Sequence, residues 1–127
     1  MKINIASNEI IHFIGIGGIG MSGLAQIMNN MGFQIKGSDL YNNKNTDRLT
    51  KAGIKIYIGH HPTNIKKATM VVISSAIKKN NTELIASKVK KLPIFKRGEM
   101  LANVVALKKN DSKNVYVKVE NVIRELI

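Results

Sequence analysis

Cysteine is absent from this 127-residue chain. Without it, no disulfide framework, thiolate nucleophile or cysteine-ligated metal site is possible. Long hydrophobic runs are also missing: none approaches the roughly 20 residues of a membrane span, and the N-terminus lacks the apolar core of a signal peptide. We therefore expect a cytoplasmic protein with no membrane partner.

Acidic residues are scarce, with 8 Asp and Glu against 20 Lys and Arg, and the formal net charge is +12. Such a balance raises the possibility of nucleic-acid binding, because basic side chains neutralise phosphates. However, 17 of these residues are lysine, whereas base readout and stacking favour arginine. The lysines are also scattered in pairs such as Lys66-Lys67 and Lys90-Lys91. We expect no nucleic-acid partner, but a positive field that attracts anionic small molecules.

Apolar runs typical of strands alternate with segments of helical periodicity. The expected strands are 10–15, 33–37, 54–58, 70–74 and 93–95. The expected helices are 19–31, 46–52 with Thr46 as N-cap, 81–91 and 97–108, with a short helical turn starting at His61-Pro62. This alternation predicts an α/β fold, a Rossmann-like five-stranded parallel sheet in the order 3-2-1-4-5 with helices on both faces.

A glycine cluster follows the first expected strand and opens the first helix. Gly15, Gly17 and Gly20 match the G-x-G-x-x-G spacing of loops that lay a diphosphate on a helix N-terminus. Side chains there would block the approach of the backbone, and free N–H groups with the helix dipole attract an anion. The pattern predicts a nucleotide-diphosphate site, although a glycine turn used only for packing has the same spacing.

In the predicted strand order, ligands bind at the switch point between the first and fourth strands. The glycine loop and residues 74–76 should therefore face each other across one crevice. Asp39 lies where a dinucleotide fold places an acid for ribose hydroxyls, or it caps the turn after the second strand. Ser74 and Ser75 would otherwise only cap the next helix. His12 is expected to be a core histidine with its hydrogen bonds satisfied.

Four segments in order point to a family. The glycine loop is followed by Gly37-Ser38-Asp39-Leu40, Ser74-Ser75-Ala76-Ile77 and Arg97-Gly98-Glu99-Met100-Leu101. Over residues 8–108 the chain resembles the N-terminal domain of the Mur ligases, the ATP-dependent amino-acid ligases of peptidoglycan synthesis. Two of the segments, Gly-Ile-Gly-Gly-Ile-Gly-Met-Ser-Gly and Ser-Ser-Ala-Ile, fit the member that joins L-alanine to UDP-N-acetylmuramate better than members acting later.

This resemblance implies a domain that binds the UDP part of UDP-N-acetylmuramate and anchors it for a remote active site. Asp39 and, as a secondary candidate, His60 would lie near the uridine, while Arg97 would meet the sugar-lactyl or phosphate charge. The diphosphate would lie on Gly15, Gly17, Gly18, Ile19, Gly20, Met21 and Ser22. The opposite wall of the site would consist of Ser74, Ser75, Ala76 and Ile77.

The resemblance ends after Lys108. Full-length ligases continue into a central ATPase domain and a C-terminal domain, whereas this sequence holds no Gly-x-x-x-x-Gly-Lys-[Ser/Thr] phosphate loop. We therefore divide the chain into a UDP-binding domain, 1–108, and a divergent tail, 109–127, with helical periodicity in its second half. No catalytic residue and no metal site is expected here. ATP and Mg²⁺, implied for the full-length family, would bind the missing domains, and the chain would be an excised domain, a truncated product or one subunit beside a separate chain.

Two other functions stay open. An NAD(P)-binding Rossmann module shares the glycine spacing and Asp39, but leaves the Ser-Ser-Ala-Ile and Arg-Gly-Glu-Met-Leu segments unexplained. A non-catalytic remnant would keep the fold but bind no ligand in the crevice.

Overall fold

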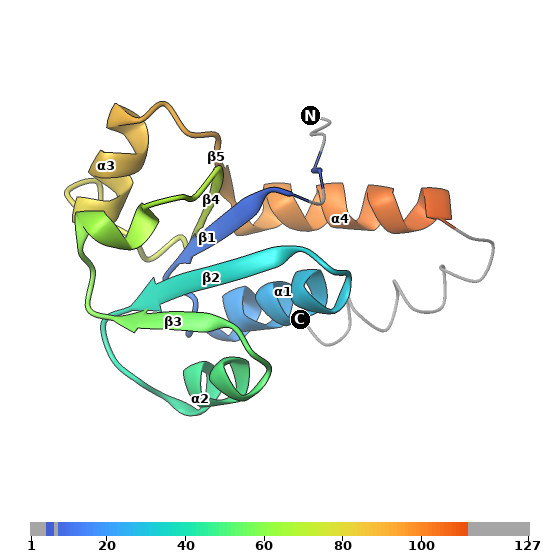
Figure 1. Ribbon diagram of the computed structural model, residues 1–127, viewed down its shortest axis with the longest axis horizontal. Coiled ribbons are helices and arrows are strands. Elements are labelled where there is room, and N and C mark those ends of the chain that lie inside the picture. Colours follow the sequence, from blue (N-terminus) through green and yellow to red (C-terminus); the bar gives the residue numbers. More distant parts are fainter. Residues whose placement is uncertain (1–4, 7, 112–127) are drawn as a thin grey trace.

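The computed structural model describes residues 5, 6 and 8–111, of which 108–111 are described by backbone alone. Strands and helices alternate along the chain (Figure 1). The strands are β1 (Ile10–Ile14), β2 (Gln34–Asp39), β3 (Lys55–Ile58), β4 (Met70–Ile73) and β5 (Ile94–Lys96). The helices are α1 (Ile19–Asn30), α2 (Lys44–Lys51), α3 (Thr82–Val89) and α4 (Arg97–Asp111), with a 3₁₀ turn, η1, at Pro62–Ile65.

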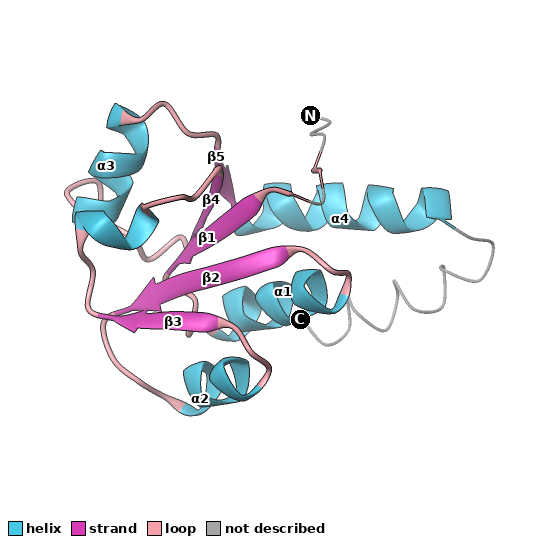
Figure 2. Cartoon of the chain, viewed as in Figure 1, coloured by secondary structure: helices cyan, strands magenta, loops and turns pink. Residues whose placement is uncertain are grey.

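The five strands form one parallel sheet in the order β3-β2-β1-β4-β5. This confirms the predicted α/β class and strand order. Figure 2 shows the strands pointing the same way, so the loops that follow them gather at one edge of the sheet. The chain winds from β1 to β2 and β3 on one side and returns to β4 and β5 on the other. The switch point therefore lies between β1 and β4.

The two faces of the sheet bury different chemistry. Alternate residues of β1 point to opposite faces. Ile11 and Phe13 join the main apolar core under α1, α2 and α4, whereas Ile14 packs with Leu84 of α3 in a smaller cluster. On that second face the central strands also carry His12, Lys36 and Ser38, all buried. Polar side chains thus lie beneath α3 and η1, next to the switch point.

Most element boundaries differ from the predicted ones by one to three residues. Three of these differences concern a helix cap, the end of the second strand and the end of the domain. The N-cap of α2 is Asn43 and not Thr46, because the Asn43 side chain accepts from the N–H groups of Asn45 and Thr46 while Thr46 closes a capping box. Strand β2 continues through Asp39, because its last two residues pair with β3. Helix α4 runs to Asp111, past the predicted end of the domain at residue 108. The predicted helical part of the tail lies outside the described residues.

Among the described residues, no helix combines the length and the hydrophobicity needed to cross a bilayer.

Candidate functional site

The loops after β1 and β4 meet at the switch point, as predicted. Gly15 has a φ of +87°, a conformation that side chains disfavour, and a Cβ built there would lie 3.0 Å from the Cβ of Ser74. The N–H groups of Gly15 and Ile16 both donate to the carbonyl of Ser38, at 2.9 Å each. The first glycine is therefore required by backbone conformation and by close packing of the two loops.

Two adjoining cavities open at this edge of the sheet. The larger cavity has a volume of about 520 Å³ and lies between the start of α1, the loop after β4 and the start of α4. The smaller cavity has a volume of about 330 Å³ and lies between the glycine loop, the end of β2 and the loop after β3. Gly18, Ser74 and Ile77 line both cavities. Because they share these residues, the two cavities form one crevice at this edge of the sheet.

The crevice gathers nearly all of the predicted site residues. The larger cavity is lined by Gly18, Ile19, Gly20, Met21, Ser74, Ser75, Ile77 and Arg97, and the smaller one by Gly15, Gly17, Gly18, Asp39, His60, Ser74, Ala76 and Ile77. Ser22 lines neither cavity. Its side chain is fully buried, donates to the carbonyl of Ile19 at 3.1 Å and accepts from Arg48 at 3.3 Å. Ser22 therefore supports the first turn of α1 from behind.

Gly17 lies at the tightest point of the loop. Its N–H donates to Asp39 Oδ2 at 2.7 Å, and its carbonyl accepts from the side-chain amides of Asn43 at 3.2 Å and Asn45 at 2.9 Å. The other carboxylate oxygen of Asp39 accepts from the N–H of Leu40 at 2.8 Å. Asp39 therefore caps the turn after β2 and fixes the glycine loop while it lines the smaller cavity. The N-terminus of α2 clamps the loop from the other side.

The N-terminus of α1 has no capping side chain and no acidic residue to balance the positive end of the helix dipole. Its N-cap, Gly18, provides no side-chain hydrogen bond, and its first turn contains no acidic residue. The first N–H groups of a helix have no partner within that helix, and the dipole makes this end positive. Arg97 adds a cation directly: its Nη1 lies 2.9 Å from where a Cβ of Gly20 would be. Lys96 lines the same cavity. This end of the crevice is built for an anion.

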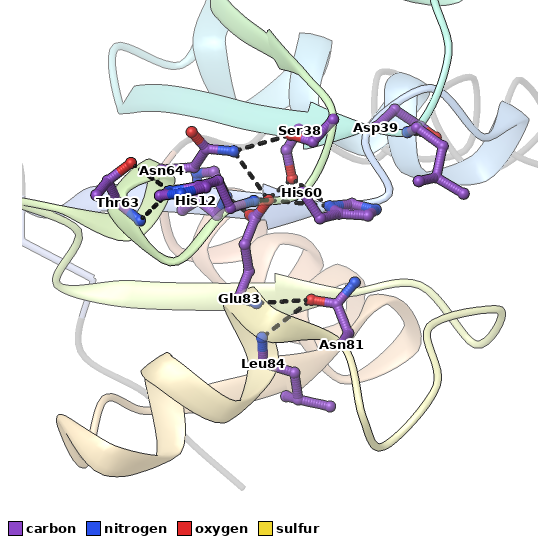
Figure 3. Close-up of polar contacts among 12 residues, drawn as sticks. His12, Ser38, Asp39, His60, Thr63, Asn64, Asn81, Glu83 and Leu84 are labelled. Carbon is purple, nitrogen blue, oxygen red and sulfur yellow. Dashed lines mark hydrogen bonds and ion pairs between the residues drawn. The ribbon is translucent and has the colours of Figure 1, made fainter.

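A buried carboxylate binds several polar groups, including a residue that lines the smaller cavity (Figure 3). Glu83 of α3 is fully buried. Its Oε1 accepts from Ser38 Oγ at 2.7 Å and contacts His12 Nε2 at 2.5 Å. Its Oε2 accepts from Asn64 Nδ2 at 3.0 Å and the N–H of His61 at 3.1 Å. Oε2 also lies 2.9 Å from Nδ1 of His60, a residue that lines the smaller cavity.

These contacts set the charge state of the cluster. Burial raises the pKa of Glu83, but hydrogen bonds from His12, Ser38 and Asn64 outweigh it and lower the pKa from 4.5 to about 2. Burial lowers the pKa of His12 despite its contact with the carboxylate, so His12 is neutral and Glu83 is ionised at neutral pH. The predicted core position of His12 is confirmed. Its predicted hydrogen bonding is confirmed only at Nε2, because Nδ1 is buried with no partner among the described residues. The buried amine of Lys36 donates to the backbone carbonyls of Asn64 and Lys66, and burial lowers its pKa.

Stability should depend on pH through this cluster. The folded-state pKa of Glu83 is depressed, so its stabilising contribution is present above pH 4.5 and is lost as pH falls from 4.5 towards 2. We expect a loss of up to about 3 kcal/mol over this window. The lowered pKa of His12 adds a decline that starts below pH 6.5, where the unfolded chain binds a proton that the folded chain excludes. Urea unfolding followed by circular dichroism at several pH values measures this. A Glu83→Gln variant should no longer lose stability between pH 4.5 and 2. If that loss is unchanged in the variant, Glu83 is not its cause.

Several residues of the site were not predicted from the sequence, among them Asn43, Lys96 and Glu83. Asn43, which clamps the glycine loop, is recognisable only as one of several asparagines before α2. Lys96 lines the larger cavity but looks like any of the scattered lysines. Glu83 follows the N-cap Asn81 at the start of α3, where an acid is ordinarily explained by the helix dipole. Nothing in the local sequence indicates that its side chain is buried.

Comparison with known proteins assigns the chain to a family. The family model described as Mur ligase family, catalytic domain, matches residues 10–109. The chain is 67% identical over 110 residues to the UDP-N-acetylmuramate–L-alanine ligase of Pelagibacter ubique, covering 87% of this chain and 24% of that protein. It is 54% identical over 100 residues to the ligase of the same name from Rickettsia bellii, covering 79% of this chain and 21% of that protein. The chain therefore spans about a quarter of the length of these relatives.

Solved structures agree. The crystal structure of the UDP-N-acetylmuramate–alanine ligase of Thermotoga maritima superimposes with a TM-score of 0.76 at 31% identity, covering 79% of this chain and 23% of that chain. A UDP-N-acetylmuramate:L-alanyl-γ-D-glutamyl-meso-diaminopimelate ligase from Neisseria meningitides gives a TM-score of 0.72 at 30% identity, covering 77% of this chain and 32% of that chain. Sequence, fold and the crevice at the switch point thus lead to one conclusion: the chain belongs to the Mur ligase family.

Proposed function

We propose that this chain is the UDP-N-acetylmuramate-binding domain of a ligase that adds L-alanine to that nucleotide-sugar in peptidoglycan synthesis. We place the binding domain at residues 1–108 and an appended tail at residues 109–127, with helix α4 continuing from the domain to Asp111. The observation that carries the proposal is the uncapped N-terminus of α1, against which the guanidinium of Arg97 packs in the larger cavity. The names of the relatives, which specify this substrate, support the same assignment.

The diphosphate fits the start of α1. The N–H groups of the first turn and the positive helix end would donate to phosphate oxygens. The guanidinium of Arg97 would add charge-assisted hydrogen bonds, either to a phosphate or to the lactyl carboxylate of the sugar. Ser74 and Ser75 line the opposite wall of the larger cavity with hydroxyl groups. The sugar end of the ligand therefore occupies the larger cavity.

The nucleoside fits the smaller cavity. Asp39 offers carboxylate oxygens there, each of which can accept from a ribose hydroxyl in addition to the backbone N–H that it already holds. Leu40 and Ile77 provide apolar surface for a flat base, and His60 provides a polar edge. One charged end and one largely apolar end match the two ends of a nucleotide-sugar.

The ligation itself needs groups beyond this domain. Among residues 5, 6 and 8–111, no three His, Asp or Glu side chains are grouped as a metal site. The whole sequence also lacks a Gly-x-x-x-x-Gly-Lys-[Ser/Thr] loop, the phosphate loop that the resemblance implies for the ATPase domain of the full-length ligases. ATP and Mg²⁺ therefore do not fit the residues present here. We propose that this domain anchors the nucleotide end and so positions the muramyl carboxylate for further ligase domains, on the same polypeptide or on a separate one.

Calorimetric titration tests the proposal. UDP-N-acetylmuramate should bind the chain saturably, and NADH should neither bind nor compete. Binding of NADH alone would instead assign the crevice to a dinucleotide. Binding of neither compound would overturn the proposed function and favour a remnant that has lost its ligand.

Asp39→Asn should weaken binding of UDP-N-acetylmuramate by about tenfold, because the amide loses the charge and satisfies only one of the two backbone N–H groups that Asp39 now holds. The same titration measures the effect. Asp47→Asn is the matched control, since Asp47 is an exposed acid in the first turn of α2 that lines neither cavity. Equal affinities of the two variants would count against a role for Asp39.

A further inference from the structure

His60 presents one ring nitrogen inward and the other towards the smaller cavity. Nδ1 lies 2.9 Å from Glu83 Oε2 and 3.1 Å from Ser38 Oγ. Nε2 has no hydrogen-bond partner among the described residues and is not fully buried. The side chain is 11% exposed, and the residue lines the cavity. Nε2 is therefore the atom that a ligand meets.

The contacts on Nδ1 determine where the proton lies. An ionised carboxylate can only accept, so Glu83 Oε2 requires a donor at Nδ1. Ser38 Oγ already donates its proton to Glu83 Oε1 at 2.7 Å, so its oxygen also accepts from His60. Both neighbours thus favour a proton on Nδ1. In the neutral imidazole this leaves a lone pair on Nε2, facing the cavity.

The carboxylate of Glu83 is held in place by its other hydrogen bonds, so it does not move if the His60 ring rotates. His12 and Ser38 bind one carboxylate oxygen, and Asn64 and the N–H of His61 bind the other. These groups come from β1, β2, η1 and the loop before it, so the position of the carboxylate is fixed by the fold. Figure 3 shows these side chains converging on Glu83. The carboxylate therefore keeps Nδ1 of His60 as the hydrogen-bond donor and leaves Nε2 as the acceptor.

We propose that Glu83 is a positioning residue for the nucleoside pocket: it holds the proton of His60 on Nδ1, so that Nε2 accepts a hydrogen bond from a ring N–H of the bound base. This inference rests on the proposed function and adds a rule of base selection to it. Uracil carries an N–H at position 3, whereas cytosine carries a lone pair there. The Glu83–His60 pair therefore selects uracil over cytosine without Glu83 touching the ligand.

Nitrogen-15 NMR of the ring nitrogens in the free protein tests the first half of the proposal without a mutation. The His60 resonances of the neutral imidazole should show a protonated Nδ1 and an unprotonated Nε2. In Glu83→Gln the amide has no charge, so the preference for the Nδ1 proton should weaken. Glu9→Gln removes an acid at the opposite end of β1 and should leave the His60 resonances unchanged. A proton on Nε2 of His60 in the wild-type protein would overturn the proposal.

Binding of UDP and of N3-methyl-UDP tests the second half, because the methyl group removes the base N–H. The ratio of their dissociation constants in the wild-type protein contains the hydrogen bond plus any steric cost of the methyl group. His60→Phe keeps an aromatic ring but removes the hydrogen bond to the base, together with the Nδ1 contacts to Glu83 and Ser38. Because both ligands are measured on the same variant, the loss of the Nδ1 contacts affects both, and the ratio should fall by about 3- to 10-fold. Glu83→Gln should lower the ratio in the same direction, and Glu9→Gln should not.

The two proposals fail in different ways. If the wild-type protein binds neither UDP nor UDP-N-acetylmuramate, the proposed function fails and the inference falls with it. If UDP binds and the ratio is the same in the wild-type, His60→Phe and Glu83→Gln proteins, only the inference is overturned.

Discussion

Glu83→Ala is expected to lower the free energy of unfolding by about 3–5 kcal/mol, a large fraction of the stability of a domain of this size. The carboxylate accepts from two side chains through one oxygen and from a backbone N–H and further side chains through the other. Alanine leaves these buried donors without an acceptor, and each unsatisfied group costs about 1–3 kcal/mol. It also leaves a cavity in the second face of the sheet.

Urea unfolding followed by circular dichroism measures this loss. Glu99→Ala is the matched control, because Glu99 is also an acid in the first turn of a helix but is exposed. Its carboxylate accepts one hydrogen bond, from the N–H of Lys96 at 2.8 Å, so its removal should cost about 1 kcal/mol. A Glu83→Ala variant as stable as Glu99→Ala would mean that the buried donors find water or other partners.

The strand order was predictable because it follows from local patterns. Apolar runs, helical periodicity and glycines between them define the elements, and right-handed crossovers then leave few arrangements. The crevice followed from the strand order alone. The N-cap of α2 was not predictable, because residues 42–46 offer several cap-forming side chains in a row, and only the tertiary contacts of Asn43 and Asn45 with Gly17 select among them.

The polar cluster could not be predicted for a different reason. The apolar run of β1 is buried on both faces, so its sequence does not show that His12 points away from Phe13 and towards α3. Its partner Glu83 lies 71 residues further along the chain. A contact of that separation depends on how α3 crosses the sheet. Ser22 shows a further effect of tertiary structure: in the first turn of α1 its side chain is buried and lines neither cavity, which the spacing of the glycines does not reveal.

Gly17→Val is expected to weaken binding of UDP-N-acetylmuramate by roughly 100-fold, equivalent to about 3 kcal/mol. A Cβ at Gly17 would lie 2.8 Å from Asp39 Oδ2, 2.9 Å from Asn43 Nδ2 and 3.1 Å from Thr46 Cγ2. The first two atoms are ends of flexible side chains, but both bind the backbone of Gly17 itself. They cannot move aside without releasing the loop. The branched side chain therefore breaks the clamp and displaces Asp39 and Asn43, which line the smaller cavity.

Calorimetric titration measures the affinity, and thermal unfolding shows whether the variant is folded. Ala102→Val is a suitable control, because it adds a branched side chain at an exposed position of α4 outside both cavities. If Gly17→Val does not fold, Gly17→Ala places a single methyl group against the same three atoms and should still weaken binding by about tenfold. We expect the larger loss of affinity for Gly17→Val than for Gly17→Ala because valine is the bulkier side chain at the same position. Wild-type affinity in a folded Gly17→Val protein would show that the ligand does not depend on the loop held by Asp39 and Asn43, and the diphosphate would then have to bind elsewhere.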